Sequence, residues 1–285
     1  MSRLLVVLTL LAVAGEARAR DLLASDRNYR SPQHFAFELK FGPYSPDIDS
    51  TPGLKGKPFS DLFVGQDSES FGKRPAGALL TTLEFDWQIF RGFGSLGLAG
   101  SVGFMRRTTH GFQYADDDYT PCTPSRDFGC TRSGDETSLN VMPLSLELVY
   151  RFDILAQRWH IPIVPYLKGG VAYYLWFIQN GAGSLANCDK RNPPLMGTCL
   201  DPNTPLKGER EEAIGGTFGL VAHPGVALLL DVLEPGVART MDVELGINHS
   251  YLFFELNYAW VTGFGSKTKM VLSDVTWNAG LAFEF

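Results

Sequence analysis

The stretch FAFELKF, residues 35–41, decides the fold of this chain: large apolar side chains occupy every odd position, and Ala36, Glu38 and Lys40 occupy the even ones. Successive side chains of a β-strand point to opposite faces, so this alternation predicts a strand with one apolar and one polar face. Helical spacing of apolar residues is almost absent from the rest of the chain. The pattern therefore predicts an all-β fold.

The same alternation recurs in seven further segments, at about residues 77–90, 94–106, 138–152, 163–178, 213–223, 247–261 and 274–285. The resulting count of eight strands is even, as an antiparallel barrel requires. The long or polar connections are residues 42–76, 107–137, 179–212 and the shorter 262–273. They alternate along the chain with the turns, so we expect all long loops at one end of the structure.

One connection departs from this rule. Residues 224–246 are too long for a turn, and Asp231 and Glu234 are spaced to share one helical face before Pro235-Gly236. We expect a short helix at the turn end, capping the barrel. A sixth strand that continues through Leu230 is the alternative.

The composition excludes several classes of protein. The chain has 285 residues, 45% hydrophobic and 20% charged, with a mean hydropathy of -0.03, which is too apolar for a disordered chain. A net charge of -6 and a pI near 5.4 provide no basic surface, so nucleic acid is not an expected partner. Beyond the first fourteen positions no run of eighteen apolar residues occurs, which excludes a bundle of transmembrane helices.

The N-terminus has the features of an export signal. Arg3 is followed by the apolar stretch 4–14 and by Ala17-Arg18-Ala19, which fits the small-x-small cleavage pattern. We therefore expect a signal peptide at 1–19, a periplasmic lead at 20–33 and a barrel domain at 34–285. A short buried N-terminal helix is the alternative for the first segment.

Export to an oxidising compartment makes disulfides the expected state of the four cysteines. Cys122 and Cys130 lie in one polar loop, and Cys188 and Cys199 lie in another. Pairing within each loop would stabilise the protein by roughly 2.5 to 3 kcal/mol per bond in the chain-entropy model. The connectivity stays open, since four cysteines allow three pairings. A zinc site is disfavoured because neither pair has the Cys-x-x-Cys spacing or a histidine cluster.

Side-chain size separates a membrane barrel from a soluble, lipocalin-like carrier. The bulky Phe, Leu, Trp and Tyr side chains occupy one face of each strand, whereas Gly, Ala, Ser and scattered charges occupy the other. The interior of an eight-stranded barrel is narrow, so the bulky face is expected outside, in lipid. Aromatic residues near the predicted strand ends suit interfacial belts: Trp87, Phe90, Phe93, Phe152, Trp159, Tyr258 and Trp260.

The C-terminal stretch 277–285, WNAGLAFEF, resembles the last strand of bacterial outer-membrane proteins, which alternates apolar residues and ends in an aromatic one. The resemblance implies that Leu281, Phe283 and Phe285 form the signal read by the barrel-assembly machinery, although Tyr is also common at the position of Phe283. Residues 35–44 and 246–253 are similar to an uncharacterised group of myxobacterial outer-membrane β-barrel proteins. The implied fold is an eight-stranded antiparallel transmembrane β-barrel in the cell outer membrane of a Gram-negative bacterium, with long outward loops.

The polar face of the strands carries nine charged residues that we expect inside the barrel: Glu38, Lys40, Glu84, Asp86, Glu147, Arg151, Lys168, Glu255 and Glu284. Buried charges must find partners or neutralise, so these residues are expected to form a paired network that fills the interior. A narrow small-solute pore is the alternative.

No catalytic constellation is evident. His249 and Ser250 are adjacent and would point to opposite faces of a strand, and no Gly-x-Ser-x-Gly motif occurs. The acidic clusters 116–118 and 47–49 lack the EF-hand spacing and suit solvated loops better than a cation site. We expect no catalytic residue, cofactor or metal ion.

We interpret the chain as a surface structural or binding scaffold that acts through disulfide-pinned extracellular loops. Its expected partners are outer-membrane lipid and lipopolysaccharide, the barrel-assembly machinery and an unknown extracellular ligand. A barrel enzyme acting on outer-membrane lipid is the alternative from another class.

Overall fold

The computed structural model describes residues 34–54, 57–64, 76–112, 131–159, 161–189, 210–266 and 268–285. The expected signal peptide, the periplasmic lead 20–33, the acidic cluster 116–118 and Cys122, Cys130 and Cys199 lie outside these residues. Of Cys188, only the backbone is described. The two disulfides therefore stay predictions.

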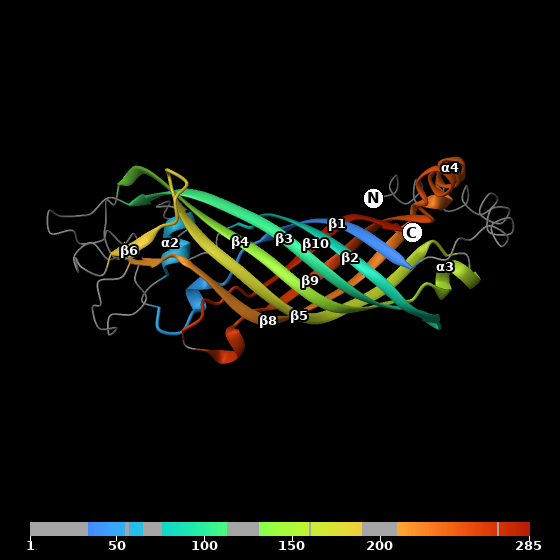
Figure 1. Ribbon diagram of the computed structural model, residues 1–285, viewed down its shortest axis with the longest axis horizontal. Helices are drawn as coiled ribbons and strands as arrows, with labels where there is room; N and C mark the ends of the chain where they lie inside the picture. The colour runs from blue at the N-terminus through green and yellow to red at the C-terminus, as the bar shows by residue number, and fades with distance from the viewer. Residues whose placement is uncertain are drawn as a thin grey trace, which may run out of the picture.

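Eight strands form a closed antiparallel barrel in the order β1-β10-β9-β8-β5-β4-β3-β2 (Figure 1). Their bounds are β1 Phe35–Tyr44, β2 Ala78–Gly92, β3 Gly94–Phe112, β4 Arg132–Arg151, β5 Ile163–Asn180, β8 Ile214–Leu229, β9 His249–Trp260 and β10 Asp274–Glu284. The predicted eight-stranded all-β fold is confirmed. Each barrel strand pairs with the next barrel strand along the chain, and β1 also pairs with β10 and thereby closes the barrel.

Closure joins residues 35–41 to the C-terminal strand. Leu39 lies opposite Leu281 and Phe37 lies opposite Phe283. The Phe285 amide donates to the Phe35 carbonyl oxygen over 2.9 Å. Pairing of β1 with β10 removes the strand edges that an open sheet would leave, and lipid tolerates no such edges.

The two ends of the barrel differ as expected. β1 begins and β10 ends at the terminal end, where β2 and β3 are joined by a tight turn through Phe93. The connections of the opposite end, the loop end, include the helices η2 Ile48–Ser50, α2 Pro58–Val64 and η5 Gly263–Gly265. They also include a small sheet of β6 Asn187–Asp189 paired with β7 Arg210–Glu212.

Strands β3 and β4 extend well into the segment 107–137, which we predicted to be a loop. Thr108 pairs with Ser138 and Thr109 with Thr137, and the Thr108 and Ser138 hydroxyls lie 2.9 Å apart. These pairs are polar on both faces, so hydrophobic periodicity cannot detect them. The prediction was wrong here because backbone pairing, not apolar alternation, extends the strands.

The segment 224–246 combines both predicted alternatives, but the helix does not cap the barrel. β8 continues to Leu229, the turn η4 Leu230–Val232 follows, and α4 occupies Pro235–Leu245. Figure 1 shows α4 beside the barrel at the terminal end, outside the line of the strands, while α3 Ile154–Trp159 lies near the opposite wall. No helix among the described residues is long and apolar enough to cross a membrane.

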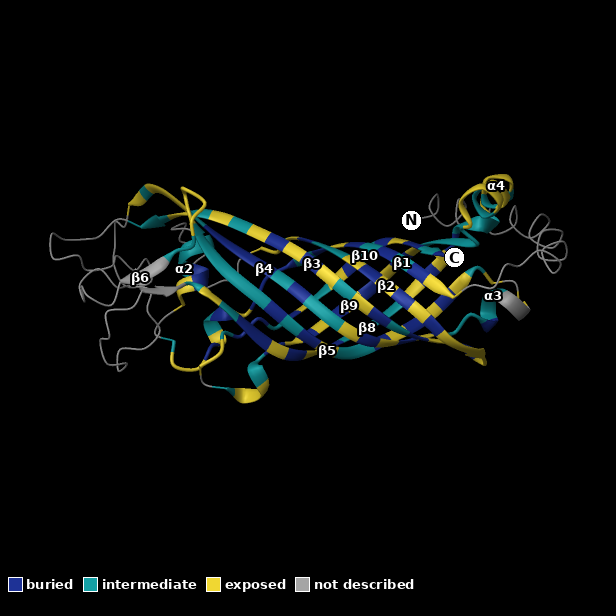
Figure 2. Ribbon diagram, in the orientation of Figure 1, coloured by how far each residue is buried: buried dark blue, intermediate teal, exposed yellow. Residues whose placement is uncertain are grey.

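The barrel wall shows the two-face pattern along its length (Figure 2). Exposed and buried residues alternate along β9, where Phe254, Leu256 and Tyr258 are exposed while Glu255 and Asn257 are buried. The largest apolar side chains of the wall therefore face outward. Leu148 and Phe218, for example, are 59% and 58% exposed.

The interior of the loop-end half is apolar, which differs from the small and polar interior that we predicted. Its buried core consists of Tyr44, Ile48, Phe59, Leu80, Met105, Leu139, Val141, Ala172, Tyr174, Val221, Ala259, Val261 and Leu272. The wall strands supply most of it, and η2 and α2 add Ile48 and Phe59 from the loops. Sequence periodicity misassigned this half because its inward residues are as apolar as its outward ones.

Close contact between strands explains some of the glycines. A Cβ atom on Gly170 would lie 2.0 Å from the carbonyl oxygen of Leu146 on the neighbouring strand, whereas a Cβ on the exposed Gly100 would meet no atom within 4 Å. Of these two positions, only Gly170 therefore excludes a larger side chain.

We predict that Gly170→Ala lowers the free energy of unfolding of the reconstituted barrel by about 1–3 kcal/mol, as overpacking does. Gly100→Ala, the matched control, should change it by less than about 0.5 kcal/mol. Equilibrium urea unfolding followed by tryptophan fluorescence measures both. Equal stability of the two variants would contradict the close packing of β4 against β5.

Candidate functional site

All nine charged residues predicted for the interior lie inside the barrel, and each is less than a tenth exposed. They lie in the half of the barrel nearer the terminal end, whereas the apolar core lies in the half nearer the loop end. Seven of them form one set joined by hydrogen bonds and ion pairs, which we call the charge network: Glu38, Lys40, Glu84, Asp86, Arg151, Lys168 and Glu255.

Two lysines form the centre of the charge network. Lys168 Nζ donates to Glu38 Oε2 over 2.5 Å and to Glu84 Oε1 over 2.6 Å. Lys40 Nζ donates to Glu84 Oε2 over 2.5 Å and to Glu255 Oε1 over 3.2 Å. The charges therefore alternate in sign across the lumen, from Glu38 through Lys168, Glu84 and Lys40 to Glu255. These residues come from β1, β2, β5 and β9, so the chain of ion pairs crosses the barrel.

Arg151 extends the charge network towards the terminal end. Its guanidinium donates to Asp86, and its Nη2 donates to Glu38 Oε1 over 2.8 Å. Asp86 is fully buried, and its other carboxylate oxygen lies where a Cβ atom on Gly97 would stand. The small inner face of β3 thus provides the volume that the long charged side chains of the neighbouring strands occupy.

Neutral groups complete the coordination of the carboxylates. The Tyr166 hydroxyl donates to Glu255 Oε2 over 3.0 Å, and the Asn278 amide donates to Glu255 Oε1 over 3.1 Å. The aromatic ring of Tyr166 lies 5.0 Å from Lys168 Nζ, and that of Phe253 lies 5.8 Å from it, both suited to cation–π attraction. Most of the buried charged atoms therefore have short, directed partners, as burial requires, whereas Asp86 Oδ1 has no hydrogen-bond partner among the described residues.

A second polar cluster surrounds Glu147 and contains a residue that the sequence reasoning did not assign. His223 Nδ1 lies 2.8 Å from Glu147 Oε2, and its Nε2 lies 2.9 Å from Asn257 Oδ1. The Ser145 hydroxyl donates to Glu147 Oε1 over 2.5 Å. The alternation of residues 213–223 places His223 on the inner face of its strand, and this shared face with the inward Glu147 is the signal that could have identified it as a partner.

Glu284, the ninth predicted charge, lies at the terminal mouth. It accepts hydrogen bonds from the Gln88 amide over 3.0 Å and from the Tyr251 hydroxyl over 3.1 Å. Just outside the strands, burial raises the pKa of Asp153 above its usual value, and the charge of Glu284 raises it further.

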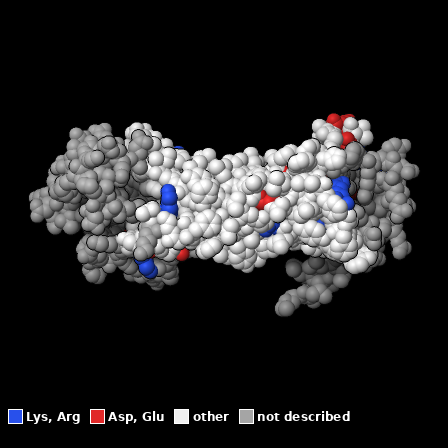
Figure 3. Space-filling model, turned by 60° about the horizontal axis from the view of Figure 1, so that its bottom comes forward, with Lys and Arg blue, Asp and Glu red and all other residues white. Residues whose placement is uncertain are grey.

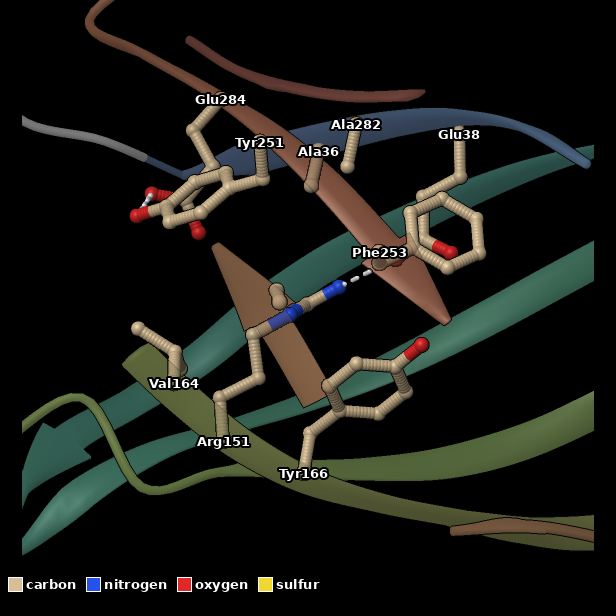
Figure 4. Close-up of a pocket in the computed structure, with 10 residues that line it drawn as sticks. Ala36, Glu38, Arg151, Val164, Tyr166, Tyr251, Phe253, Ala282 and Glu284 are labelled. Atoms are coloured by element: carbon tan, nitrogen blue, oxygen red, sulfur yellow. Dashed lines mark hydrogen bonds and ion pairs between the residues drawn. The ribbon is translucent and has the colours of Figure 1, made fainter. Parts of the chain in front are cut away.

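A small cavity opens at this mouth (Figure 4). Arg151 and Tyr166 point into it from one side, and Tyr251 and Glu284 lie together on the other. It has room for about one water molecule, and Glu38 and Arg151 of the charge network line it.

The interior is acidic overall. Of the nine predicted charges, six are carboxylates and three are cations. Each cation therefore bridges at least two carboxylates, as Lys40, Arg151 and Lys168 all do. The loss of one cation therefore enlarges the excess of negative charge in the lumen, whereas the loss of one carboxylate reduces it.

The residues considered for chemistry are engaged in structural contacts. His249 Nδ1 lies 2.5 Å from Asp231 Oδ2, and the Ser250 amide donates to Asp231 Oδ1 over 3.1 Å, so the two neighbours hold one carboxylate. Asp49 accepts the amides of Phe59 and Ser60 at the start of α2. Within the described ranges, no group of three or more His, Cys, Asp or Glu side chains is arranged to hold a metal ion.

The exterior identifies the environment of the barrel. Lys, Arg, Asp and Glu are sparse over the visible wall (Figure 3), while large apolar side chains are exposed along every strand pair. Exposed aromatic residues lie at both ends: Phe90, Phe93 and Trp159 at the terminal end, and Tyr258 and Trp260 at the loop end. A closed barrel with an apolar belt and aromatic girdles is built to span lipid.

The residues of the predicted assembly signal lie on the closing strand. Leu281 is exposed, and Phe283 and Phe285 are half-buried. All three are within β10 or directly after it, where the strand pairs with β1.

Comparison with known proteins adds little beyond the barrel itself. No protein-family model and no curated protein matches the chain. Among solved structures, Ail, the attachment invasion locus protein of Yersinia pestis, matches with 11% identity and a TM-score of 0.35, over 89% of this chain and 97% of Ail. A major outer membrane protein from Thermus thermophilus matches with 14% identity and a TM-score of 0.40, over 90% of this chain and 100% of that chain.

These likenesses are too distant to carry an argument. The closed strand order and the apolar exterior identify the chain as an outer-membrane β-barrel.

We predict that Lys168→Met lowers the free energy of unfolding by about 3–5 kcal/mol, because it removes the closest cation of Glu38 and a cation of Glu84 and increases the excess of buried negative charge. Glu84→Gln should lower the free energy of unfolding by less, because carboxylates outnumber cations in the lumen and the loss of one reduces this excess. The exposed Lys269→Met serves as the control and should change stability by less than about 0.5 kcal/mol. Urea unfolding of the reconstituted protein measures all three, and equal costs for Lys168→Met and Lys269→Met would contradict the network.

Proposed function

We propose that this outer-membrane barrel is a closed, non-catalytic scaffold that serves a surface structural or binding role through its loop-end segments. The observation that carries the proposal is the filled lumen: the charge network occupies the terminal-end half, and the apolar core occupies the loop-end half. A barrel whose interior is occupied by side chains in both halves is suited to holding loops in place rather than to passing solutes.

The loop-end core supports the closed state. The Tyr44 hydroxyl donates to the Leu272 carbonyl oxygen over 2.8 Å, and Tyr44 packs beside Tyr174 with ring centroids 6.1 Å apart. Phe59 of α2 lies in the same core, and the Arg107 guanidinium of β3 lies 5.0 Å from the centre of the Phe63 ring. The helix α2 therefore covers the loop end of the lumen with side chains that are anchored to the wall.

The loop end offers the surfaces for such a role. At the loop end, β3 and β4 stay paired as far as Phe112 and Arg132. The Arg132 side chain connects this extension to α2, because it donates to the Leu62 carbonyl oxygen over 2.9 Å. In this proposal the long loops that follow are pinned by the disulfides Cys122–Cys130 and Cys188–Cys199. Its partners are lipopolysaccharide in the outer leaflet and an extracellular ligand that the structure does not identify.

Two further parts of the proposal rest on sequence resemblance. Leu281, Phe283 and Phe285 would be read by the barrel-assembly machinery during insertion, which their position at the end of the closing strand supports. Residues 35–44 and 246–253 are similar to uncharacterised myxobacterial barrels. They form β1 and lead into the start of β9, and both strands contribute residues to the charge network.

We predict that the purified barrel shows no steady conductance steps in planar lipid bilayers, because the lumen is filled. A general porin in the same bilayers is the positive control, and recovery of the folded barrel is checked by its heat-modifiable migration in gels. Reproducible steps that depend on the protein would overturn the closed scaffold and favour a small-solute pore.

We predict that peptide mapping of the exported, non-reduced protein recovers Cys122 linked to Cys130 and Cys188 linked to Cys199. Each bond closes a short loop and should add roughly 2.5 to 3 kcal/mol of stability. The reduced and alkylated protein is the control. Recovery of all four cysteines as free thiols from the oxidising compartment would contradict the pinned loops.

A further inference from the structure

The helix α4 has no buried face at the terminal end. None of its residues in Pro235–Leu245 is buried, and its N-cap residue, Glu234, makes no side-chain capping bond. Isolated helices shorter than about 12–15 residues are marginal in water, and this one has 11 residues. A second surface is therefore needed to account for its stability.

Its position limits what that surface is. The helix follows the end of β8 and precedes the start of β9, and it stands outside the barrel wall rather than over the lumen (Figure 1). It reaches the same end as the β2–β3 turn, which carries the exposed Phe93 of the aromatic girdle. In a membrane barrel this level is the interface of the periplasmic leaflet, because the short turns face the periplasm.

The base of the helix is held at that level by the wall. Asp231 of η4 binds both His249 Nδ1, at 2.5 Å, and the Ser250 amide, at 3.1 Å. The preceding outward pair on the wall, Leu228 opposite Leu252, is exposed and belongs to the lipid-facing belt. The surface of α4 is therefore continuous with a surface that already contacts lipid.

The exposed side chains of the helix are suited to such an interface. Val237, Met241 and Leu245 are spaced four residues apart and form one stripe, of which Met241 is half-buried. Val237 and Leu245 stay 54% and 66% exposed, and Leu233, just before the helix, is 68% exposed. Val243 lies on the opposite side of the helix, so it provides a residue of the same type outside the stripe.

Charge agrees with a phospholipid surface. Figure 3 shows acidic atoms on the segment that stands out from the wall at the terminal end. The segment 234–245 carries three acidic residues, Glu234, Asp242 and Glu244, and one basic residue, Arg239, so its formal charge is negative. Carboxylates at headgroup depth can pair with the ammonium groups of phosphatidylethanolamine.

We propose that α4 is an interfacial helix that lies in the periplasmic leaflet of the outer membrane, with Leu233, Val237 and Leu245 inserted among the lipids. The partner is a phospholipid surface that contains phosphatidylethanolamine. Binding is driven by burial of the apolar stripe beside the lipid belt, as for other helices that lie in the membrane plane. This inference does not depend on the scaffold role of the loops.

Photo-crosslinking in the full chain tests the proposal and keeps the native cysteines. Benzoylphenylalanine replaces Val237, Leu245 or Val243, one at a time, and the protein is reconstituted in vesicles of phosphatidylethanolamine and phosphatidylglycerol. Mass spectrometry should show lipid adducts at 237 and 245 in several-fold higher yield than at the matched position 243. Heat-modifiable migration confirms that each labelled barrel is folded.

A charge substitution then tests the driving force. With the crosslinker at Leu233, the variant V237D/L245D should reduce the lipid adducts several-fold, whereas V243D should leave them unchanged. The proposal is overturned by equal adduct yields at 237 and 243, by the absence of lipid adducts at 237 and 245, or by adducts to a second protein chain instead. The last result would assign the stripe to a dimer contact.

Discussion

The pairing of buried charges inside a closed barrel is the constraint on which the rest of the structure depends. Glu38 and Glu84 share Lys168, and Glu84 and Glu255 share Lys40, so the loss of either lysine removes a cation from two carboxylates at once in a volume that water barely reaches. Because the exterior is committed to lipid, the polar atoms of the strands must be satisfied from within.

This constraint explains features that lie apart in the sequence. The inner face of β3 is reduced to Gly97 and Ala99, because the carboxylate of Asp86 and its partner Arg151 occupy the space beside it. Strands β1 and β10 can close the barrel in one register only, since a shift by one residue would turn Glu38 and Lys40 into lipid. The apolar core at the loop end then completes the filling of the lumen where the charges stop.

Much of this could be predicted from the sequence, because a period of two along a strand fixes which residues face inward. The strand count, the apolar exterior and the inward position of Glu147 or Lys168 all followed from that period. The partner of each charge did not follow, because it depends on the register and shear of strands far apart in the chain. His223 stood on the correct face, yet only the barrel brings it to Glu147.

The failures have physical reasons as well. The β3–β4 extension is made of polar pairs such as Thr108 with Ser138, so hydrophobic periodicity carries no signal there. The loop-end core was missed because Met105 and Leu139 are apolar on the inner face of strands that are apolar outside. The helix α4 was expected from local composition, but local composition contains no signal for its place outside the wall, near the contact of Asp231 with His249 on β9.

A double-mutant cycle between Glu38 and Lys168 tests the central claim most directly. The free energy of unfolding is measured in urea for the wild type, Glu38→Gln, Lys168→Met and the double variant. A directly paired, buried couple should show a coupling energy of about 1–3 kcal/mol, with the double variant more stable than the sum of the single losses implies. Additive losses, with a coupling near zero, would show that the buried charges do not depend on one another and would contradict the account.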